Sequence, residues 1–210
     1  MITVKKYQVG IMSTNAYVIT DAATGEVAVI DPGFEDSRLT QHLDEAGSEK
    51  VKYILLTHGH FDHIGHAAEY ARRYNADIVI SNEEKDFLQD ENLNLSCMFH
   101  TGALAPFEAD LYLCDDDVIT LGDCKLKFIL TPGHTKGSGC FVCESDRLIF
   151  SGDTLFYCSM GRTDFPTGSP RLMSESLSRL RALEGDYKVY PGHDRSTTLS
   201  FERANNPYMR

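Results

Sequence analysis

Short apolar runs alternate along the chain with longer amphipathic stretches. Runs closed by glycine, proline or aspartate are typical of β-strands, whereas apolar residues three and four positions apart indicate helices. The pattern predicts strands over residues 2–9, 16–20, 26–30, 51–56, 77–80, 111–113, 118–121, 124–130, 139–142 and 187–190, and an apolar strand-like run beginning at residue 148. It predicts helices over residues 37–46, 64–75, 83–90, 170–183 and 199–205.

The order of these elements indicates one domain. A mixed succession of hairpins and helices favours two sheets with helices outside them. No fixed-period repeat and no Pro/Ser-rich linker divides the sequence, so we predict a single domain over residues 1–210. Residues 91–109 show no clean period, and a loop of that length in a compact domain is often a lid or a binding loop.

Composition excludes some classes of function. The 210 residues are 42% hydrophobic, which is enough for a sizeable core, and the net charge of -11 argues against nucleic-acid binding. No apolar run approaches the ~20 residues that span a membrane, and the N-terminus lacks a signal-peptide core. We therefore expect a cytoplasmic protein that binds neither nucleic acid nor a membrane, with its six cysteines reduced.

The segment Thr-His-Gly-His-Phe-Asp-His at residues 57–63 follows an apolar strand and gathers four ligand-type side chains. His58 and His60 are two positions apart, so in extended chain they project to one side and can bind one metal ion together. Asp62 and His63 come where the chain turns into a helix, and they cannot comfortably face the same ion. The spacing therefore indicates two adjacent ion positions. Imidazole nitrogen and carboxylate oxygen suit zinc, iron or manganese better than calcium.

Three further apolar strands end in a glycine beside a ligand-type residue: Gly133 before His134, Gly152 before Asp153, and Gly192 before His193. Glycine permits a sharp exit of the backbone and a close approach of side chains. Four such strand ends predict a site along one edge of a sheet sandwich. The candidates divide into one set for each ion, with a carboxylate left to bridge both: His58, His60 and His134; Asp62, His63 and His193; and Asp153.

Two bridged ions would hold a water molecule or hydroxide between them. Metal binding lowers the pKa of water to about 7 in favourable sites, which supplies a nucleophile without serine or cysteine. Two divalent ions offset by Asp62, Asp153 and hydroxide leave a charge of roughly +1, which favours an anionic substrate or a developing oxyanion. Asp62 also has a second oxygen that can orient the water or accept its proton.

These residues together resemble the signature of the metallo-β-lactamase superfamily, and their order and spacing match its glyoxalase II-like (hydroxyacylglutathione hydrolase-like) branch. The resemblance implies an α/β fold, an αββα four-layer sandwich of two mixed β-sheets with helices on the outer faces. It implies two divalent metal ions, usually zinc but also iron or manganese, and hydrolysis of a small thioester or ester. An aspartate at the position of Asp31 supports the site from behind the ligands in this family, and Thr57 is expected to act beside it.

Departures from the family pattern reduce the number of activities within the superfamily that this chain is expected to have. The commonest zinc lactamases have cysteine among the ligands of the second ion and arginine at the position of His63, and this chain has neither. Flavodiiron proteins place glutamate at the position of Gly59, so an electron-transfer role is not expected. Glyoxalase II proper continues into a helical domain that helps to hold glutathione, whereas residues 194–210 are all that follows His193 here. Recognition of glutathione is therefore left open.

Residues 161–165 lie where related glutathione-using enzymes place a basic residue. Arg162 would there grip a substrate carboxylate through paired hydrogen bonds, and the alternative is a structural pair with Asp164. Tyr157 follows Asp153 closely and is a candidate for lining the substrate pocket.

The same segment also resembles the persulfide dioxygenases, which use one iron held by residues matching His58, His134 and Asp153. A mononuclear non-haem iron persulfide dioxygenase is therefore the alternative function. A non-catalytic metal-binding scaffold is disfavoured, because binding alone would not require a carboxylate placed like Asp62.

Other histidines receive no ligand role. His66 follows His63 by one helical turn and is expected to lie behind the ligands or at the surface. His42 and His100 have no ligand-type neighbours and are expected to face solvent or to pack.

Overall fold

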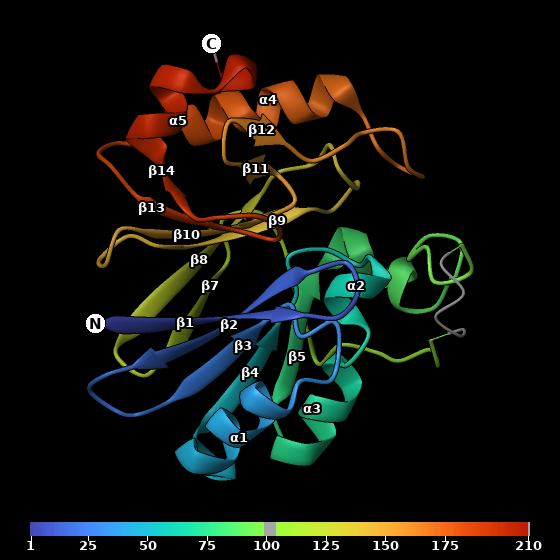
Figure 1. The fold of residues 1–210 in the computed structure, drawn as a ribbon, viewed down its shortest axis with the longest axis vertical. Coiled ribbons are helices and arrows are strands. Elements are labelled where there is room, and N and C mark those ends of the chain that lie inside the picture. The colour runs from blue at the N-terminus through green and yellow to red at the C-terminus, as the bar shows by residue number, and fades with distance from the viewer. Residues whose placement is uncertain (99–103, 210) are drawn as a thin grey trace.

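The structure of the chain is a computed structural model that describes residues 1–98 and 104–209 (Figure 1). The first sheet has six strands in the order of the sequence, β1 (Ile2–Val9), β2 (Thr14–Asp21), β3 (Val27–Ile30), β4 (Val51–Leu55), β5 (Asp77–Ser81) and β6 (Leu111–Leu113). The strands β1, β2 and β3 pair antiparallel, whereas β3 to β6 pair parallel, so the sheet is mixed.

The second sheet also has six strands, and its order is β14-β13-β10-β9-β8-β7. Its members are β7 (Val118–Leu121), β8 (Cys124–Leu130), β9 (Gly139–Cys143), β10 (Leu148–Gly152), β13 (Lys188–Pro191) and β14 (Thr197–Thr198). Only β10 and β13 pair parallel, because α4 (Pro170–Arg181) provides the crossover between them. A small hairpin of β11 (Leu155–Phe156) and β12 (Ser159–Met160) follows β10.

The two sheets lie against each other with helices on their outer faces (Figure 1). Three apolar layers hold these sheets and helices together. The central layer lies between the two sheets, where Leu55 and Val79 meet Phe128 and Phe150. A second layer packs α1 (Ser37–Ala46) and α3 (Ala67–Tyr74) on the outer face of the first sheet. A third packs α4 and α5 (Leu199–Asn205) on the second sheet. The predicted αββα sandwich of two mixed sheets is confirmed.

The prediction of one helix over residues 64–75 is wrong. The chain instead forms a single turn, α2 (Phe61–Ile64), followed by α3. The two helices are separate because the backbone N–H of His66 donates to the carbonyl oxygen of Pro32 at 3.2 Å, in place of the helical partner four residues before it. This break lets α2 carry Asp62 and His63 while α3 packs against the sheet.

Shorter elements differ more from the prediction. The helix expected over residues 83–90 is a 3₁₀ helix, η2 (Asn82–Leu88), and two further 3₁₀ turns are η1 (Ser48–Lys50) and η3 (Pro207–Met209). Part of the predicted loop 91–109, together with His100, lies outside the described residues. No helix in the described part of the chain has both the length and the apolar character needed to cross a lipid bilayer.

Candidate metal centre

Four strand ends from the two sheets meet at one edge of the sandwich. The chain leaves β4 at Thr57, β8 at Thr131, β10 at Asp153 and β13 at Gly192. The glycines permit this approach, because a Cβ on Gly152 would lie 2.4 Å from Oγ1 of Thr57. A Cβ on Gly192 would lie 2.2 Å from Oδ1 of Asp153. Because these strand-end glycines have no side chain, the ligand-type residues of neighbouring strands can approach one another closely.

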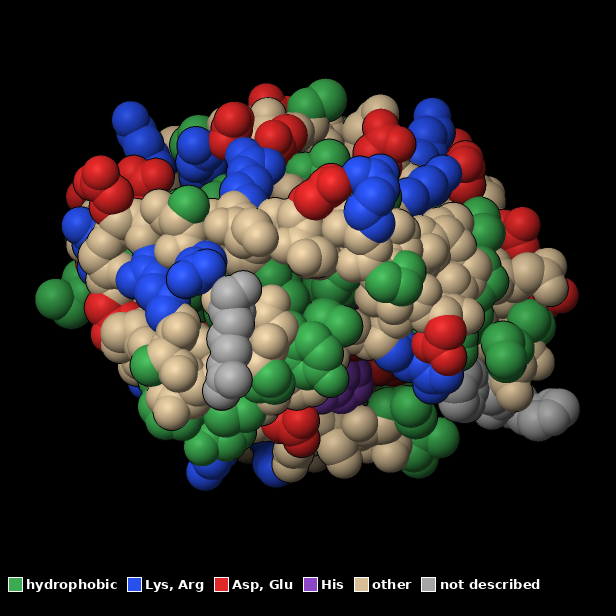
Figure 2. Space-filling model, turned by 90° about the horizontal axis from the view of Figure 1, so that it is seen from above, with side chains coloured by type: hydrophobic (Ala, Val, Ile, Leu, Met, Phe, Trp, Pro, Cys, Tyr) green, Lys and Arg blue, Asp and Glu red, His purple; other side chains and the backbone are tan. Residues whose placement is uncertain are grey.

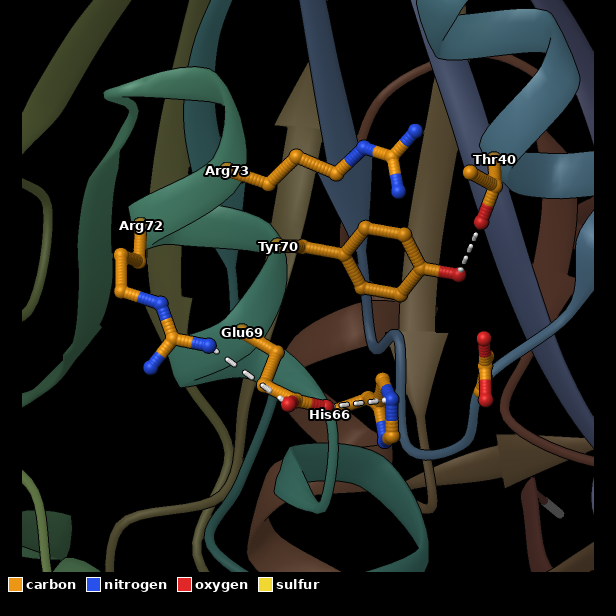
Figure 3. A pocket seen from close by; sticks show the side chains of 7 residues that line it. Thr40, His66, Glu69, Tyr70, Arg72 and Arg73 are labelled. Atoms are coloured by element: carbon orange, nitrogen blue, oxygen red, sulfur yellow. Dashed lines mark hydrogen bonds and ion pairs between the residues drawn. The ribbon is translucent and has the colours of Figure 1, made fainter.

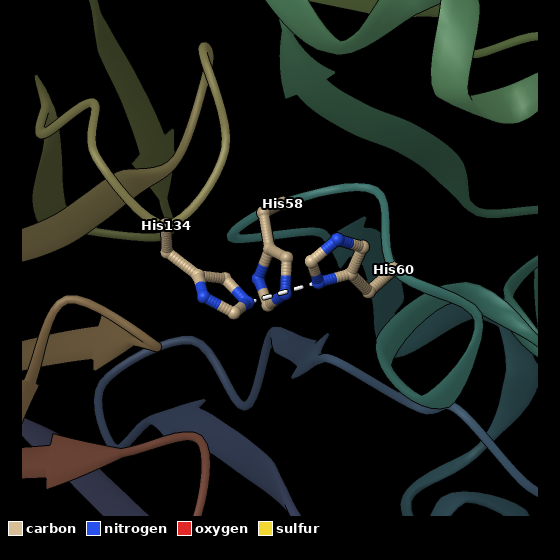
Figure 4. Close-up of side chains that lie close together, drawn as sticks. All are labelled: His58, His60 and His134. Carbon is tan, nitrogen blue, oxygen red and sulfur yellow. Dashed lines mark hydrogen bonds between the residues drawn. The ribbon is translucent and has the colours of Figure 1, made fainter. Parts of the chain in front are cut away.

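Three histidines form the first donor group. His58 and His60 come from the loop after β4, and His134 comes from the loop after β8. Their rings converge in Figure 4, with one nitrogen of each within 4.8 Å of the others. Nδ1 of His60 lies 2.9 Å from Nε2 of His134, and all three side chains are buried. Such a cluster of nitrogen donors in a low-dielectric site is the arrangement that a transition-metal ion requires.

Asp62, His63 and His193 form the second donor group. Oδ2 of Asp62 lies 3.5 Å from Nε2 of His63 and 3.3 Å from Nε2 of His193. Asp153 lies between the two groups. Its Oδ1 is 3.5 Å from Nε2 of His63, and its Oδ2 is 3.5 Å from Nε2 of His134. A third group of ligand-type side chains, His58, His63 and Asp153, overlaps the other two, so all seven candidates lie close together in the structure.

Unpaired polar atoms at the centre test whether metal ions fit. Nε2 of His58, Nε2 of His63 and Oδ1 of Asp153 are buried without a hydrogen-bond partner among the described residues. An unsatisfied buried polar group costs about 1–3 kcal/mol, so three of them at one point need a compensating ligand. Imidazole nitrogens and carboxylates are donors for zinc, iron or manganese. The residues present therefore fit divalent metal ions.

Asp31 supports the donor groups from behind. Its Oδ1 accepts a hydrogen bond from the backbone N–H of Thr57 at 2.8 Å, and its Oδ2 accepts one from Oγ1 of Thr57 at 2.7 Å. Oδ2 also lies 2.9 Å from Nδ1 of His63, which leaves Nε2 of that ring directed at the centre. In the same way Nδ1 of His134 donates to the carbonyl oxygen of Arg162 at 2.7 Å. These contacts set the orientation and tautomer of each ring.

The protonation of the centre follows from burial and from the neighbouring charges. Burial and the surrounding histidines lower the pKa of His58 and that of His60 well below the usual value, so both rings stay neutral. Burial also opposes the charged form of His63, but Asp62, Asp153 and Asp31 outweigh it and raise its pKa to about 10. The first donor group is therefore ready for an ion, whereas the second holds a proton that an ion must displace.

Thr14 is a residue of the centre that sequence reasoning missed. Its Oγ1 donates to Oδ2 of Asp62 at 2.8 Å, and both side chains are buried. Burial would raise the pKa of Asp62, but His63, His193 and this hydrogen bond hold it well below its usual range. No local pattern marks Thr14, because it reaches the site only through the hairpin of β1 and β2.

Glu84 is the second residue that the sequence did not reveal. Its Oε2 accepts from the backbone N–H of Gly59 at 2.8 Å, and its Oε1 accepts from that of Gly137 at 2.8 Å. One buried carboxylate thus ties the loop of His58 and His60 to the loop of His134. Burial raises the pKa of Glu84 from 4.5 to about 7, against the opposing hydrogen bonds. A signal was present, since Glu84 shares a helical face with the apolar Phe87 and Leu88.

A pocket of about 500 Å³ opens over the donor groups. Figure 2 shows a hollow in which a histidine side chain is visible between hydrophobic side chains. Arg162 lines this pocket, and its Nε and Nη2 each donate to the carboxylate of Asp164 at 2.7 Å. Tyr157 does not reach it. That ring stacks on Phe201 and lies 3.5 Å beneath the guanidinium of Arg195, in a separate hollow.

His66 also lies away from the centre. Its Nε2 pairs with Glu69 at 2.6 Å in a surface pocket between α1 and α3, where Tyr70 contacts Thr40 (Figure 3). His42 contacts the hydroxyl of Tyr7 at 2.8 Å. Within the described residues, neither histidine belongs to a donor group.

Comparison with known proteins gives consistent matches over most of the chain. A family model described as Metallo-beta-lactamase superfamily matches residues 9–193. Hydroxyacylglutathione hydrolase GloC of Haemophilus influenzae is 33% identical over 184 residues, 87% of this chain and 86% of that protein. The crystal structure of BLEG-1 B3 metallo-beta-lactamase has a TM-score of 0.90 at 31% identity, over 99% of each chain. TTHA1623 in a di-iron-bound form has a TM-score of 0.84 at 28% identity, over 98% of this chain and 100% of that one.

Proposed function

This chain belongs to the metallo-beta-lactamase superfamily, and we propose that it is a binuclear metal-dependent hydrolase of a small thioester or ester. The observation that carries the proposal is the position of Asp153, whose carboxylate lies between the two donor groups. Its Oδ2 is 3.5 Å from Nε2 of His134 and 3.6 Å from Nε2 of His193, and its Oδ1 is 3.5 Å from Nε2 of His63. A single ion would need only one of these groups. The similarity to GloC, whose name is hydroxyacylglutathione hydrolase, supports the thioester class.

The donor groups have separate tasks in this proposal. His58, His60 and His134 would hold one ion, Asp62, His63 and His193 would hold the other, and Asp153 would be shared between them. The bound ions, zinc in this proposal with iron or manganese as alternatives, would supply a hydroxide at neutral pH and polarise the carbonyl of the substrate. The di-iron form of TTHA1623 supports two ions in a fold of this kind.

Residues of the chain complete the chemistry. Asp62 lines the pocket, and its carboxylate can orient the attacking water and accept its proton. Because its pKa is held well below the usual range, the carboxylate stays ionised and passes an accepted proton on readily. Thr14 orients that carboxylate by its hydrogen bond. Asp31 and Thr57 hold His63 and His58 in position. The proton accepted by Asp62 is then available to the thiolate or alkoxide that leaves.

Metal analysis of anaerobically purified protein, combined with turnover, tests the proposal. We expect two ions per chain and hydrolysis of at least one thioester from a panel that includes S-lactoylglutathione. One iron per chain with oxygen uptake on glutathione persulfide would instead identify the alternative, a mononuclear iron persulfide dioxygenase. Two bound ions without turnover on thioesters, lactones or phosphodiesters would refute the hydrolase proposal.

A further inference from the structure

We propose that the substrate is a thioester or ester whose acyl group is an apolar chain or ring, and that the pocket over the donor groups takes this acyl group and not a polar thiol half such as glutathione. The proposal rests on the hydrolase function above and names the substrate class of the same site. It follows from three properties of the pocket, namely its apolar wall, its paired charge and its size.

The wall that faces the donor groups is apolar and comes from separate parts of the chain. Its side chains lie in the turn between β1 and β2, the metal-binding segment, the loop after η2, the β11–β12 hairpin and the segment after it: Met12, Phe61, Leu95, Phe156, Met160 and Phe165. Because these segments are far apart in sequence, the apolar surface is a product of the fold. Ile11, beside Met12, has 77% of its side chain exposed, so the apolar character continues to the hairpin tip.

The positively charged side chain in this wall, Arg162, is paired with the carboxylate of Asp164. Arg162 is the one lysine or arginine among the described residues that line the pocket. Its guanidinium donates twice to Asp164 and lies 4.0 Å from the ring centre of Phe165. A glutathione group would bring two carboxylates and one ammonium into this space, and their desolvation needs partners. The pair offers no net charge, so the polar peptide is poorly matched and an apolar acyl group is well matched.

The size of the pocket determines how the affinity for an acyl group depends on the length of that group. A volume of about 500 Å³ lies within the range that encloses most of a small organic ligand. Each methylene that moves from water to this wall contributes a free energy that corresponds to about a fourfold gain in affinity. Methionine side chains such as Met12 and Met160 adapt to acyl groups of different shape. We therefore expect affinity to rise with chain length until the pocket is filled.

Binding to the metal-free protein tests this inference independently of catalysis. The probes are thioethers of N-acetylcysteamine with alkyl groups from ethyl to octyl, in which a methylene replaces the carbonyl, measured by calorimetry. We expect Kd to fall about fourfold per methylene, with a heat capacity change that becomes more negative along the series. A Kd independent of chain length would overturn the inference.

Turnover by the metal-reconstituted protein gives the second test. We expect kcat/KM to rise from acetyl to octanoyl thioesters of N-acetylcysteamine and to exceed that for S-lactoylglutathione. Hydrolysis of all these thioesters with S-lactoylglutathione as the best substrate would overturn the inference and leave the proposed function standing. A length-dependent Kd in the metal-free protein, without turnover of any thioester, lactone or phosphodiester by the loaded protein, would support the apolar site and refute the hydrolase.

Two variants distinguish a loss of apolar contacts in the pocket from a general loss of protein stability. Met12→Ser removes an apolar side chain from a turn, where the side chain is 38% exposed and not part of the core. We expect octyl thioether binding to weaken about tenfold and ethyl thioether binding to change less than twofold. Val118→Ser, at a 51% exposed apolar residue of β7 outside the pocket, is the matched control and should leave both unchanged. Equal weakening of both ligands in Met12→Ser would contradict the apolar wall.

Discussion

Replacing Glu84 by glutamine tests two effects of this buried carboxylate, one on the stability of the protein and one on metal affinity. Glu84 accepts one hydrogen bond from Gly59 and one from Gly137, and these two loops carry the three histidines of the first donor group. Glutamine has nearly the same shape but only one acceptor oxygen. Its amide group would face one of the two N–H donors, so it cannot hold both loops.

The effect on stability follows from the pKa of Glu84. Burial raises it from 4.5 to about 7, so between these pH values the folded protein binds more protons than the unfolded chain. The stability of the metal-free protein therefore falls as the pH rises through this interval. A difference of about 2.5 pKa units corresponds to about 3 kcal/mol, most of it lost between pH 5 and 7. Glutamine does not titrate, so metal-free Glu84→Gln should be the more stable protein at pH 8, by up to about 3 kcal/mol.

The effect on metal binding has the opposite sign. Loss of one loop contact lets His134 move relative to His58 and His60. Groups that orient metal ligands typically contribute 10- to 100-fold in affinity, so we expect the ion of the three-histidine group to bind about tenfold more weakly. A stability gain together with weaker metal binding is the signature of a group retained for function.

Two measurements and one control check this reasoning. Urea denaturation of the metal-free protein at pH 5 and pH 8 gives the stability, and competition with a chelator gives the metal affinity. Glu83→Gln, at the exposed neighbour on the same 3₁₀ helix, should change neither. If Glu84→Gln is less stable than the wild type at pH 8 and binds metal equally well, the carboxylate is a purely structural group and the reasoning is refuted.

Three further predictions concern the donor groups themselves. Asp62→Asn should lower kcat by at least about 100-fold, because the proton acceptor is lost; retention of both ions with full turnover would show that Asp62 has no such role. Asp31→Asn leaves one acceptor for Thr57 and His63, so the affinity for the second ion, measured by chelator competition, should fall about 10- to 100-fold, and an unchanged affinity would exclude this support. Because the pKa of His63 is raised to about 10, metal binding at pH 7–8 should release a proton that a pH indicator detects, and affinity should fall as the pH is lowered. Unchanged metal content at pH 5 would contradict this linkage.

The sequence determined the fold class and the composition of the centre because both are written in local patterns. A strand of alternating or continuous apolar residues is recognisable within a few positions, and a glycine at its end marks where the chain turns sharply. The four strand ends therefore revealed the ligand-type residues without knowledge of their distances. The break between α2 and α3 was missed, because it depends on the hydrogen bond from His66 to the carbonyl oxygen of Pro32 in another part of the chain.

Only the tertiary structure decided how the residues of the centre support one another. Glu84 falls in the helix predicted over residues 83–90 with no role assigned, yet it is buried between two loops that are 78 positions apart at Gly59 and Gly137. Arg162 had two interpretations, and the structure shows the pair with Asp164. Tyr157 follows the site in sequence but turns away from it to stack on Phe201. Local patterns indicate which types of side chain can take part in the chemistry. Contacts between distant segments determine which of these side chains lie at the site, which are paired with an opposite charge and which turn away, because burial and pairing exist only in the folded chain.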